Sequence, residues 1–226
     1  MIQCQNLTKR FGQVLALDQL SFEVENRGVF GLLGPNGSGK TTFIKILLNL
    51  IQSYSGEVSI ENHSVKSHKA RSEFTFYPYD KGMQIFQFYS KMQNIEVNRL
   101  LESSLFQSFE CEKLLGKKVS QMSKGQLQKI GLICVLASGK KWIVVDEPFS
   151  GLDPIAMKDL KEYICEVSKE ACVFMSSHLL SEVERLCDKI VLIKDGKRVA
   201  YGRIKDLVIG ESLEDYFYKK VKGIMT

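Results

Sequence analysis

The pattern of hydrophobic and polar positions near the beginning of the chain predicts several strands. "IQCQNL", "LSFEVE" and "GEVSIEN" are short segments bounded by turn-forming residues, which indicates strands of an antiparallel layer. "GVFGLLG", residues 28–34, is an unbroken apolar run that ends in glycine, and such a run is typical of a strand buried on both faces. The next segment, "GKTTFIKILLNLI", residues 39–51, has the apolar content of a buried helix.

The second half of the chain repeats this alternation after an interruption. Residues 77–123 are rich in aromatic and polar side chains without strand alternation, which predicts a small, mostly helical piece. A helix from Lys124, the strand "WIVVDE", a helix after Pro154, the strand "CVFMSS" and the helix "LLSEVERLC" follow. The last predicted element is a hairpin, "KIVLIKDGKRVAYG", which turns at Asp195 and Gly196.

The alternation predicts one α/β domain over residues 1–226. Its core, with the antiparallel layer, takes in residues 1–76 and 126–226, and a helical subdomain takes in residues 77–125. A chain of 226 residues buries enough surface to be stable without disulfides. No CxxC pair and no signal segment is present, so we expect a reducing cytosol and small, buried cysteines. The six cysteines are Cys4, Cys111, Cys134, Cys165, Cys172 and Cys187.

Charge and hydropathy narrow the class of protein only a little. The net charge of +5 permits an acidic partner or an anionic membrane surface, but the sequence lacks the dense Lys/Arg stripe of a nucleic-acid binder. We therefore expect no nucleic-acid partner. The longest apolar stretches, such as "IGLICVLA", are far shorter than the roughly 18 residues of a membrane-spanning helix.

The segment "GPNGSGKT" carries the clearest chemistry in the sequence. It fits the pattern G-x-x-x-x-G-K-[ST] and lies between a predicted strand and a predicted helix. Glycines let backbone N–H groups surround phosphate oxygens, and the helix N-terminus adds positive charge. We expect Lys40 to contact the β- and γ-phosphates and the Thr41 hydroxyl to bind Mg²⁺. The predicted nucleotide-binding residues of this loop are Gly34, Asn36, Gly37, Ser38, Gly39, Lys40, Thr41 and Thr42.

Polar residues at the ends of two later strands predict hydrolysis of the bound nucleotide. "WIVVDEP" ends in Asp146 and Glu147, where we expect Asp146 to bind Mg²⁺ and Glu147 to orient and deprotonate the attacking water. The alternative is a solvated strand end. "MSSH" similarly places His178 at a strand end, where it can meet the γ-phosphate, although a lone histidine is more often structural.

The segment "QMSKGQ" has no catalytic pair, and by itself it indicates only a helix that begins with Ser123 as its N-cap. The order "GPNGSGKT", "MSKGQ", "IVVDE", "SGLD" and "MSSH", however, resembles the ATP-binding subunit of an ABC transporter over nearly the whole chain. The resemblance implies a P-loop NTPase core with antiparallel β and helical subdomains. It also implies that the signature loop, with Ser123, Gly125 and Gln126, contacts the γ-phosphate of an ATP held by a second ATPase chain.

Further residues are assigned by the same resemblance. Phe11 is similar to the aromatic residue that stacks on adenine, and its alternative is a core aromatic. Asp153, in "SGLD", is similar to a residue at the dimer interface, and Asp153-Pro154 also fits a helix start. The family's magnesium-contacting glutamine is replaced by Tyr79, and the neighbouring Asp80 is a candidate metal ligand.

The resemblance implies an ATPase with ATP and Mg²⁺ as its cofactors. It implies a homo- or heterodimer that drives transport, in the export direction, through a separate membrane-spanning permease. The subunit is then cytoplasmic and peripheral on the inner face of the cell membrane. Two alternatives stay open: a soluble ABC ATPase that acts on ribosomes or DNA, and a regulatory switch that binds ATP but hydrolyses it weakly.

Overall fold

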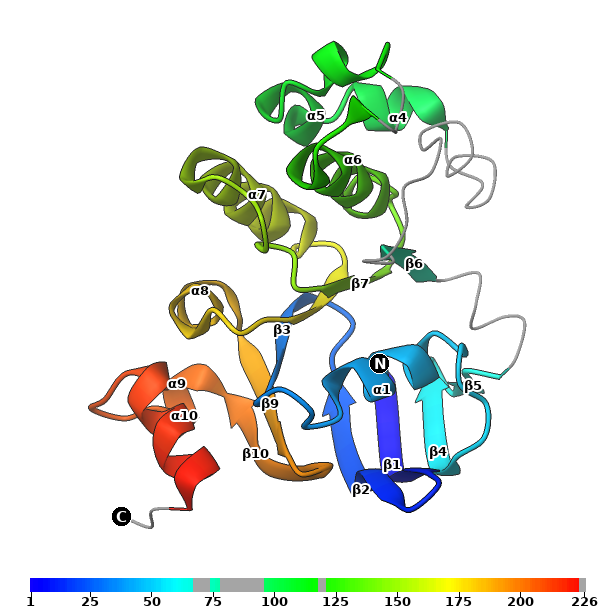
Figure 1. The fold of residues 1–226 in the computed structure, drawn as a ribbon, viewed down its shortest axis with the longest axis vertical. Coiled ribbons are helices and arrows are strands. Elements are labelled where there is room, and N and C mark those ends of the chain that lie inside the picture. Colours follow the sequence, from blue (N-terminus) through cyan, green and yellow to red (C-terminus); the bar gives the residue numbers. More distant parts are fainter. Residues whose placement is uncertain (67–73, 78–95, 118–120, 224–226) are drawn as a thin grey trace.

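The computed structural model describes residues 1–66, 74–77, 96–117 and 121–223, and its centre is a six-stranded sheet (Figure 1). The strand order is β10-β9-β3-β8-β7-β6. Neighbouring strands are parallel except β10, which is antiparallel to β9. The predicted buried strand, the two later strands and the two strands of the hairpin are thereby confirmed, whereas β6 was not predicted. The six strands are β3 (Gly28–Leu33), β6 (Phe74–Tyr77), β7 (Trp142–Asp146), β8 (Cys172–Ser176), β9 (Lys189–Lys194) and β10 (Lys197–Arg203).

Helices cover one face of this sheet, and a second, smaller sheet with helix α1 covers the other. Along β3, Val29 and Leu33 belong to the first core cluster, while Phe30 and Leu32 belong to the second. Because successive strand residues point to opposite faces, a strand between two cores must be apolar at every position. Helices α6 (Lys124–Leu136), α7 (Pro154–Val167) and α8 (Leu180–Leu186) pack in the first core, and α1 (Lys40–Leu47) packs in the second.

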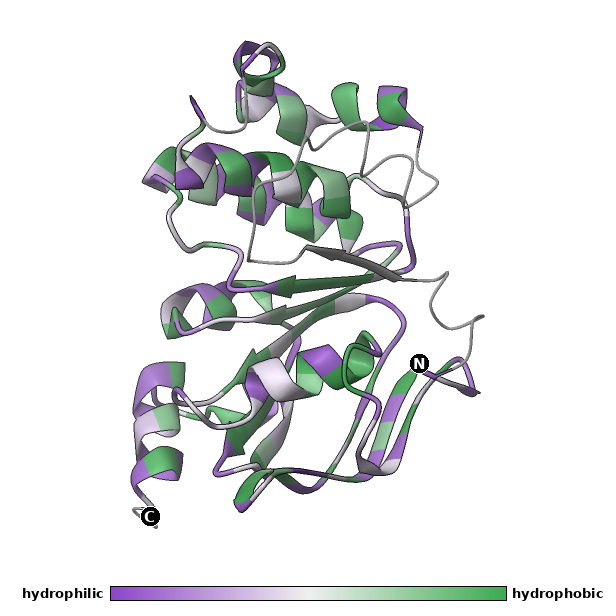
Figure 2. Cartoon of the chain, turned by 45° about the vertical axis from the view of Figure 1, so that its right-hand side comes forward, coloured by the Kyte–Doolittle hydropathy of each residue, from purple (hydrophilic) through white to green (hydrophobic). Residues whose placement is uncertain are grey.

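The smaller sheet is the antiparallel layer that the sequence predicts. Its order is β2-β1-β4-β5. The ring of Phe22 on β2 lies 6.0 Å from the ring of Phe30 on β3, so the layer is joined to the central sheet by aromatic packing. In Figure 2 the strands of the central sheet are largely hydrophobic, whereas those of the antiparallel layer mix hydrophobic and hydrophilic residues. The four strands are β1 (Ile2–Phe11), β2 (Val14–Val24), β4 (Ser55–Ile60) and β5 (His63–Ser64).

A group of short helices lies at the end of the molecule farthest from the antiparallel layer (Figure 1). Ser103 begins the second of them, because its hydroxyl accepts the Phe106 N–H. The predicted subdomain boundary after residue 125 falls inside the continuous helix α6, and the division into subdomains remains a prediction. The elements are α4 (Val97–Leu101), α5 (Ser104–Ser108), the 3₁₀ helix η1 (Cys111–Leu114) and α6 (Lys124–Leu136).

The structure differs from the sequence predictions at two points and adds two helices that the sequence did not predict. Helix α1 ends at Leu47, earlier than predicted, and Asn49 beyond it takes a left-handed φ of 58°. All six cysteines are free, but Cys165 is exposed on α7 rather than part of the core. The chain continues with α9 (Ile204–Leu207) and α10 (Leu213–Lys222). Within the described ranges, no helix combines the length and apolarity needed to cross a bilayer.

Candidate functional site

The phosphate loop joins the carboxyl end of β3 to the start of α1. Gly39 requires glycine, because its φ is 108° and an added Cβ would lie 2.5 Å from the Ala16 carbonyl oxygen. The Lys40 Nζ donates to the carbonyl oxygens of Gly34, at 2.7 Å, and Pro35, at 3.2 Å. The loop is therefore folded around its lysine by contacts of its own backbone.

The polar groups of this loop fit a bound phosphate chain. Helix α1 begins without a side-chain cap or an acidic residue in its first turn, so its first N–H groups suit an anion. The Ser38 hydroxyl is 2% exposed and lacks a hydrogen-bond partner within the described part of the chain. The Gly196 N–H, at the tip of the β9–β10 hairpin, donates to the Ser38 carbonyl oxygen at 3.1 Å. Loop shape and unpaired polar atoms thus agree with nucleotide binding.

Lys40 links the phosphate loop electrostatically to the end of β7. Burial lowers the pKa of the Lys40 amine, and the nearby carboxylates of Glu147 and Asp146 oppose this by favouring the charged form. The three side chains come from separate parts of the sequence, and the fold brings them to one edge of the sheet. An ammonium beside two carboxylates provides the charges that a phosphate and a divalent cation need.

Asp146 and Glu147 are held by the neighbouring strand β8. The Ser176 hydroxyl donates to the Asp146 carboxylate. The Glu147 N–H donates to Ser176 as well, to its carbonyl oxygen at 3.2 Å and its hydroxyl at 3.1 Å. Glu147 has a left-handed φ of 52°, so the chain turns sharply as soon as the strand ends. A continuing strand would point the two adjacent carboxylates to opposite faces of the sheet, whereas this turn leaves both at its carboxyl edge, near Lys40.

His178 lies against Glu147. Its Nδ1 is 2.6 Å from Glu147 Oε2, and its backbone N–H donates to the same oxygen at 3.3 Å. The Glu147 side chain is 25% exposed and that of His178 is 61% exposed. A carboxylate that is oriented on one side and open to water on the other is suited to act as a general base. The two predicted catalytic residues are thus brought together.

The signature loop forms the start of α6, as the sequence predicts. Ser123 and Gln126 make a capping box: the Ser123 hydroxyl accepts the Gln126 N–H at 3.2 Å, and Gln126 Oε1 accepts the Ser123 N–H at 3.0 Å. As the hydroxyl accepts this bond, its own hydrogen can be donated to another group. Ser123, Gly125 and Gln126 line a cavity of about 400 Å³.

This signature cavity is lined by lysines but by no residue of the phosphate loop. Lys113, Lys117 and Lys129 border it together with Gly151 and Asp153. Glu110 also lines it and pairs with Lys113, while Asp153 pairs with Lys129. Three lysines against two carboxylates leave the lining with a small net positive charge, and the cavity is separate from the phosphate loop of the same chain.

The structure also places Phe11 and Asp153, the predicted adenine-stacking and dimer-interface residues. Phe11 is 49% exposed, with Lys9 Nζ 4.7 Å from its ring centroid, so the alternative of a core aromatic is excluded. Asp153 caps α7 through an Oδ1 bond from the Ala156 N–H at 2.9 Å, and its Oδ2 pairs with Lys129 at 3.2 Å. Its role as a helix start is confirmed. Tyr79 and Asp80 lie outside the described residues.

Two residues that sequence reasoning missed also contact the site. Ser176 is fully buried at the end of β8 and bonds to both Asp146 and Glu147. Gln128 is 2% exposed on α6, and its amide donates to the Pro148 carbonyl oxygen at 3.0 Å. The available signal was a polar residue inside an apolar segment, because such a residue needs a specific partner.

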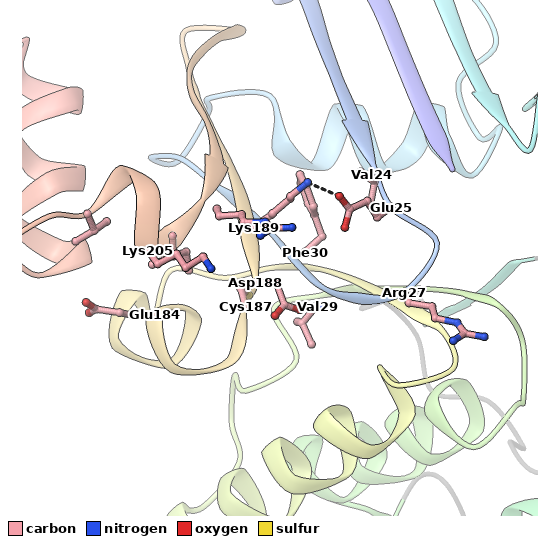
Figure 3. A pocket seen from close by; sticks show the side chains of 13 residues that line it. Val24, Glu25, Arg27, Val29, Phe30, Glu184, Cys187, Asp188, Lys189 and Lys205 are labelled. Carbon is pink, nitrogen blue, oxygen red and sulfur yellow. Dashed lines mark hydrogen bonds and ion pairs between the residues drawn. The ribbon is translucent and has the colours of Figure 1, made fainter.

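A second cavity, of about 630 Å³, lies at the opposite, amino-terminal edge of the central sheet (Figure 3). Glu25 and Lys189 form an ion pair there, and Asp188 accepts the Val29 N–H at 3.0 Å. None of the predicted site residues lines it. The candidate site therefore occupies the carboxyl edge of the parallel strands, where ligands bind in open α/β sheets.

Comparison with known proteins agrees with this geometry. Residues 17–150 match the family described as ABC transporter. The chain is 34% identical to the uncharacterized ABC transporter ATP-binding protein MJ1023 of Methanocaldococcus jannaschii, over 91% of this chain and 79% of that one. It is 31% identical to the Nod factor export ATP-binding protein I of Burkholderia orbicola, over 93% and 73%. A solved structure of an ATP-binding subunit of an ABC transporter superposes with a TM-score of 0.88 at 25% identity, over 97% and 99%. The chain belongs to the ABC transporter family and is an ATP-binding subunit that hydrolyses ATP.

Proposed function

We propose that this subunit pairs with a second ATPase chain around two ATP molecules and drives export through a separate membrane-spanning permease. One observation carries the proposal: the lining of the signature cavity contains Ser123 and three lysines but no phosphate-loop residue. Each chain then holds half of two different sites. A partner chain supplies the missing half of each.

The chemistry of the signature cavity supports this pairing. The Ser123 hydroxyl has a hydrogen to donate, and three lysines line the same cavity. Charge-assisted bonds of this kind recognise phosphate oxygens. Asp153 borders the same cavity, which supports its assignment to the interface. Phe11 is exposed beside Lys9, and it is available to stack on the adenine ring.

The hydrolytic centre is proposed on the turn that follows β7. The Thr41 hydroxyl and the Asp146 carboxylate would hold Mg²⁺, since oxygen ligands suit that cation. When bound, Mg²⁺ neutralises the charge that develops on the transferred phosphoryl group. Glu147 accepts the proton of the attacking water, while the His178 contact at 2.6 Å keeps the carboxylate oriented.

The direction of transport and the location follow from similarity. The Burkholderia relative is named as an export protein, and the tail "SLEDYF" is similar to the ends of exporter subunits. A subunit that drives a permease is peripheral on the inner face of the membrane, in the cytoplasm. Co-purification from solubilised membranes, followed by identification of the bound protein, tests this part.

The dimer is tested with Glu147→Gln, which should bind ATP but hydrolyse it very slowly. We expect size-exclusion chromatography with ATP and Mg²⁺ to yield a dimer that disappears when Lys40→Ala is added. Glu162→Gln is the matched control, because Glu162 is 69% exposed on α7 and pairs only with Lys158 at 3.9 Å among the described residues. A Glu147→Gln protein that is saturated with ATP and still monomeric would refute the pairing.

A further inference from the structure

Gln128 is a polar side chain in the apolar part of helix α6. It is 2% exposed, and the helix beyond it, from Ile130 to Leu136, is entirely buried. Burial of an amide is unfavourable unless its hydrogen bonds are made. Its Nε2 donates to the Pro148 carbonyl oxygen at 3.0 Å and reaches the Glu147 carbonyl oxygen at 3.5 Å. The side chain therefore binds the backbone of the catalytic turn.

The turn at Glu147 depends on contacts from its surroundings. A left-handed φ of 52° is unfavourable for a glutamate, and contacts from neighbouring groups offset its cost. On one side, Ser176 at the end of β8 accepts the Glu147 backbone N–H, and His178, two residues later, holds the Glu147 carboxylate. On the other side of the turn, the Gln128 amide binds the carbonyl oxygens of Glu147 and Pro148. Removal of its amide leaves the Pro148 carbonyl with no other partner among the contacts the structure describes.

Helix α6 also connects this turn to the signature loop. Gln128 lies five residues after Ser123 on one continuous helix, a rise of about 7.5 Å. Two further contacts join the start of α6 to the segment after Glu147. Lys129 pairs with Asp153 at 3.2 Å, and a Cβ on Gly125 would lie 3.0 Å from the Gly151 carbonyl oxygen. These contacts would transmit a displacement of the signature loop to the catalytic turn.

We propose that Gln128 is a positioning residue that fixes the backbone turn of Glu147 and ties it to the signature loop of the same chain. The inference rests on the proposed function where it concerns the second chain, because the signature loop then contacts the partner's ATP. Engagement of that ATP holds α6 in place, and Gln128 in turn holds the general base of the chain's own site. Gln128 acts through its bond to the backbone of the turn and not on the reacting groups.

The test replaces the amide by an apolar chain of similar size, in Gln128→Met. We expect kcat for ATP hydrolysis to fall about tenfold, the effect of one buried hydrogen bond and its unsatisfied partner. The KM for ATP should stay within twofold, because the phosphate loop is untouched. Ile133→Met is the control: Ile133 is fully buried on the same helix and contacts the turn through no hydrogen bond that the structure describes, so its kcat should be unchanged.

A double variant separates positioning from a general loss of structure. If Gln128 acts through Glu147, the residual single-turnover hydrolysis of Glu147→Gln should not slow further when Gln128→Met is added. The ATP-dependent dimer of Glu147→Gln should also persist in the double variant. A wild-type kcat in Gln128→Met, a parallel rise in KM, or a further tenfold loss in the double variant would each overturn the inference. Absence of the dimer in Glu147→Gln alone would instead count against the proposed pairing, and the kcat comparison would still decide the role of Gln128.

Discussion

Ser176→Ala is the variant that tests most directly how the site holds its metal-binding carboxylate. Ser176 is fully buried on β8, and its hydroxyl is the donor to the Asp146 carboxylate. The hydroxyl also accepts the Glu147 N–H at 3.1 Å. Alanine removes both bonds without opening a large cavity, since only one oxygen atom is lost.

The expected loss of stability in Ser176→Ala depends on which hydrogen-bond partners Glu147 and Asp146 keep. The Glu147 N–H still donates to the Ser176 carbonyl oxygen at 3.2 Å, so the substitution costs little stability at this group. Asp146 loses a charge-assisted bond, typically worth about 1.5–3 kcal/mol, but the carboxylate is partly exposed and water can replace the donor in part. We therefore expect a loss of about 1–2 kcal/mol in the free energy of unfolding. For a chain of this size, that corresponds to a Tm lower by about 2–8 °C.

The functional result should appear in the metal dependence of hydrolysis. A carboxylate that is less well oriented binds Mg²⁺ more weakly, so the half-saturating Mg²⁺ concentration should rise about threefold to tenfold. Ser177→Ala is the matched control, because Ser177 is 1% exposed and its hydroxyl accepts the Leu179 N–H at 3.0 Å. The control should lower Tm without moving the Mg²⁺ dependence. An unchanged Mg²⁺ dependence in Ser176→Ala, or an equal shift in the control, would refute the assignment.

Two further variants probe the phosphate loop and the start of α7. Lys40→Ala should weaken ATP binding about ten- to a hundredfold, because it removes a charge-assisted contact, and unchanged calorimetric titrations would exclude that contact. Hydrogen bonding from the Ala156 N–H and the charge of Lys129 lower the pKa of Asp153. The stability that Asp153 contributes is thus present above its unfolded-state pKa of about 3.9 and is lost as pH falls through the lower folded-state value. The Tm advantage of wild type over Asp153→Ala, a cap worth about 1 kcal/mol, should shrink in acid, and a constant or growing advantage would contradict the linkage.

The strands and the phosphate loop were predictable from sequence because their signals are local. An unbroken apolar run such as residues 28–34 follows directly from a strand between two cores. The glycines and Lys40 of the loop serve one ligand within a few residues of each other. The end of α1 was less predictable, because Leu48 and Leu50 continue the apolar pattern and only the left-handed Asn49 ends the helix.

The contacts around Glu147 were not predictable, because they depend on register and docking between distant segments. Ser176 faces Asp146 through the parallel pairing of β7 with β8, and no pattern within either strand specifies that pairing. Gln128 reaches Pro148 only because α6 packs beside the turn. From sequence, both residues were merely polar positions in apolar segments.

These same contacts argue for the catalytic turn independently of the motifs. Left-handed residues occur elsewhere as well, including Glu61 at a φ of 50° and Glu110 at 51°, so the conformation alone does not single out Glu147. At Glu147, an unfavourable backbone conformation coincides with two buried polar side chains, Ser176 and Gln128, that bond to its immediate surroundings. Selection for stability alone favours an apolar replacement at such positions. Their convergence on a single turn is explained if the direction of the Glu147 carboxylate matters more than the stability lost in fixing it.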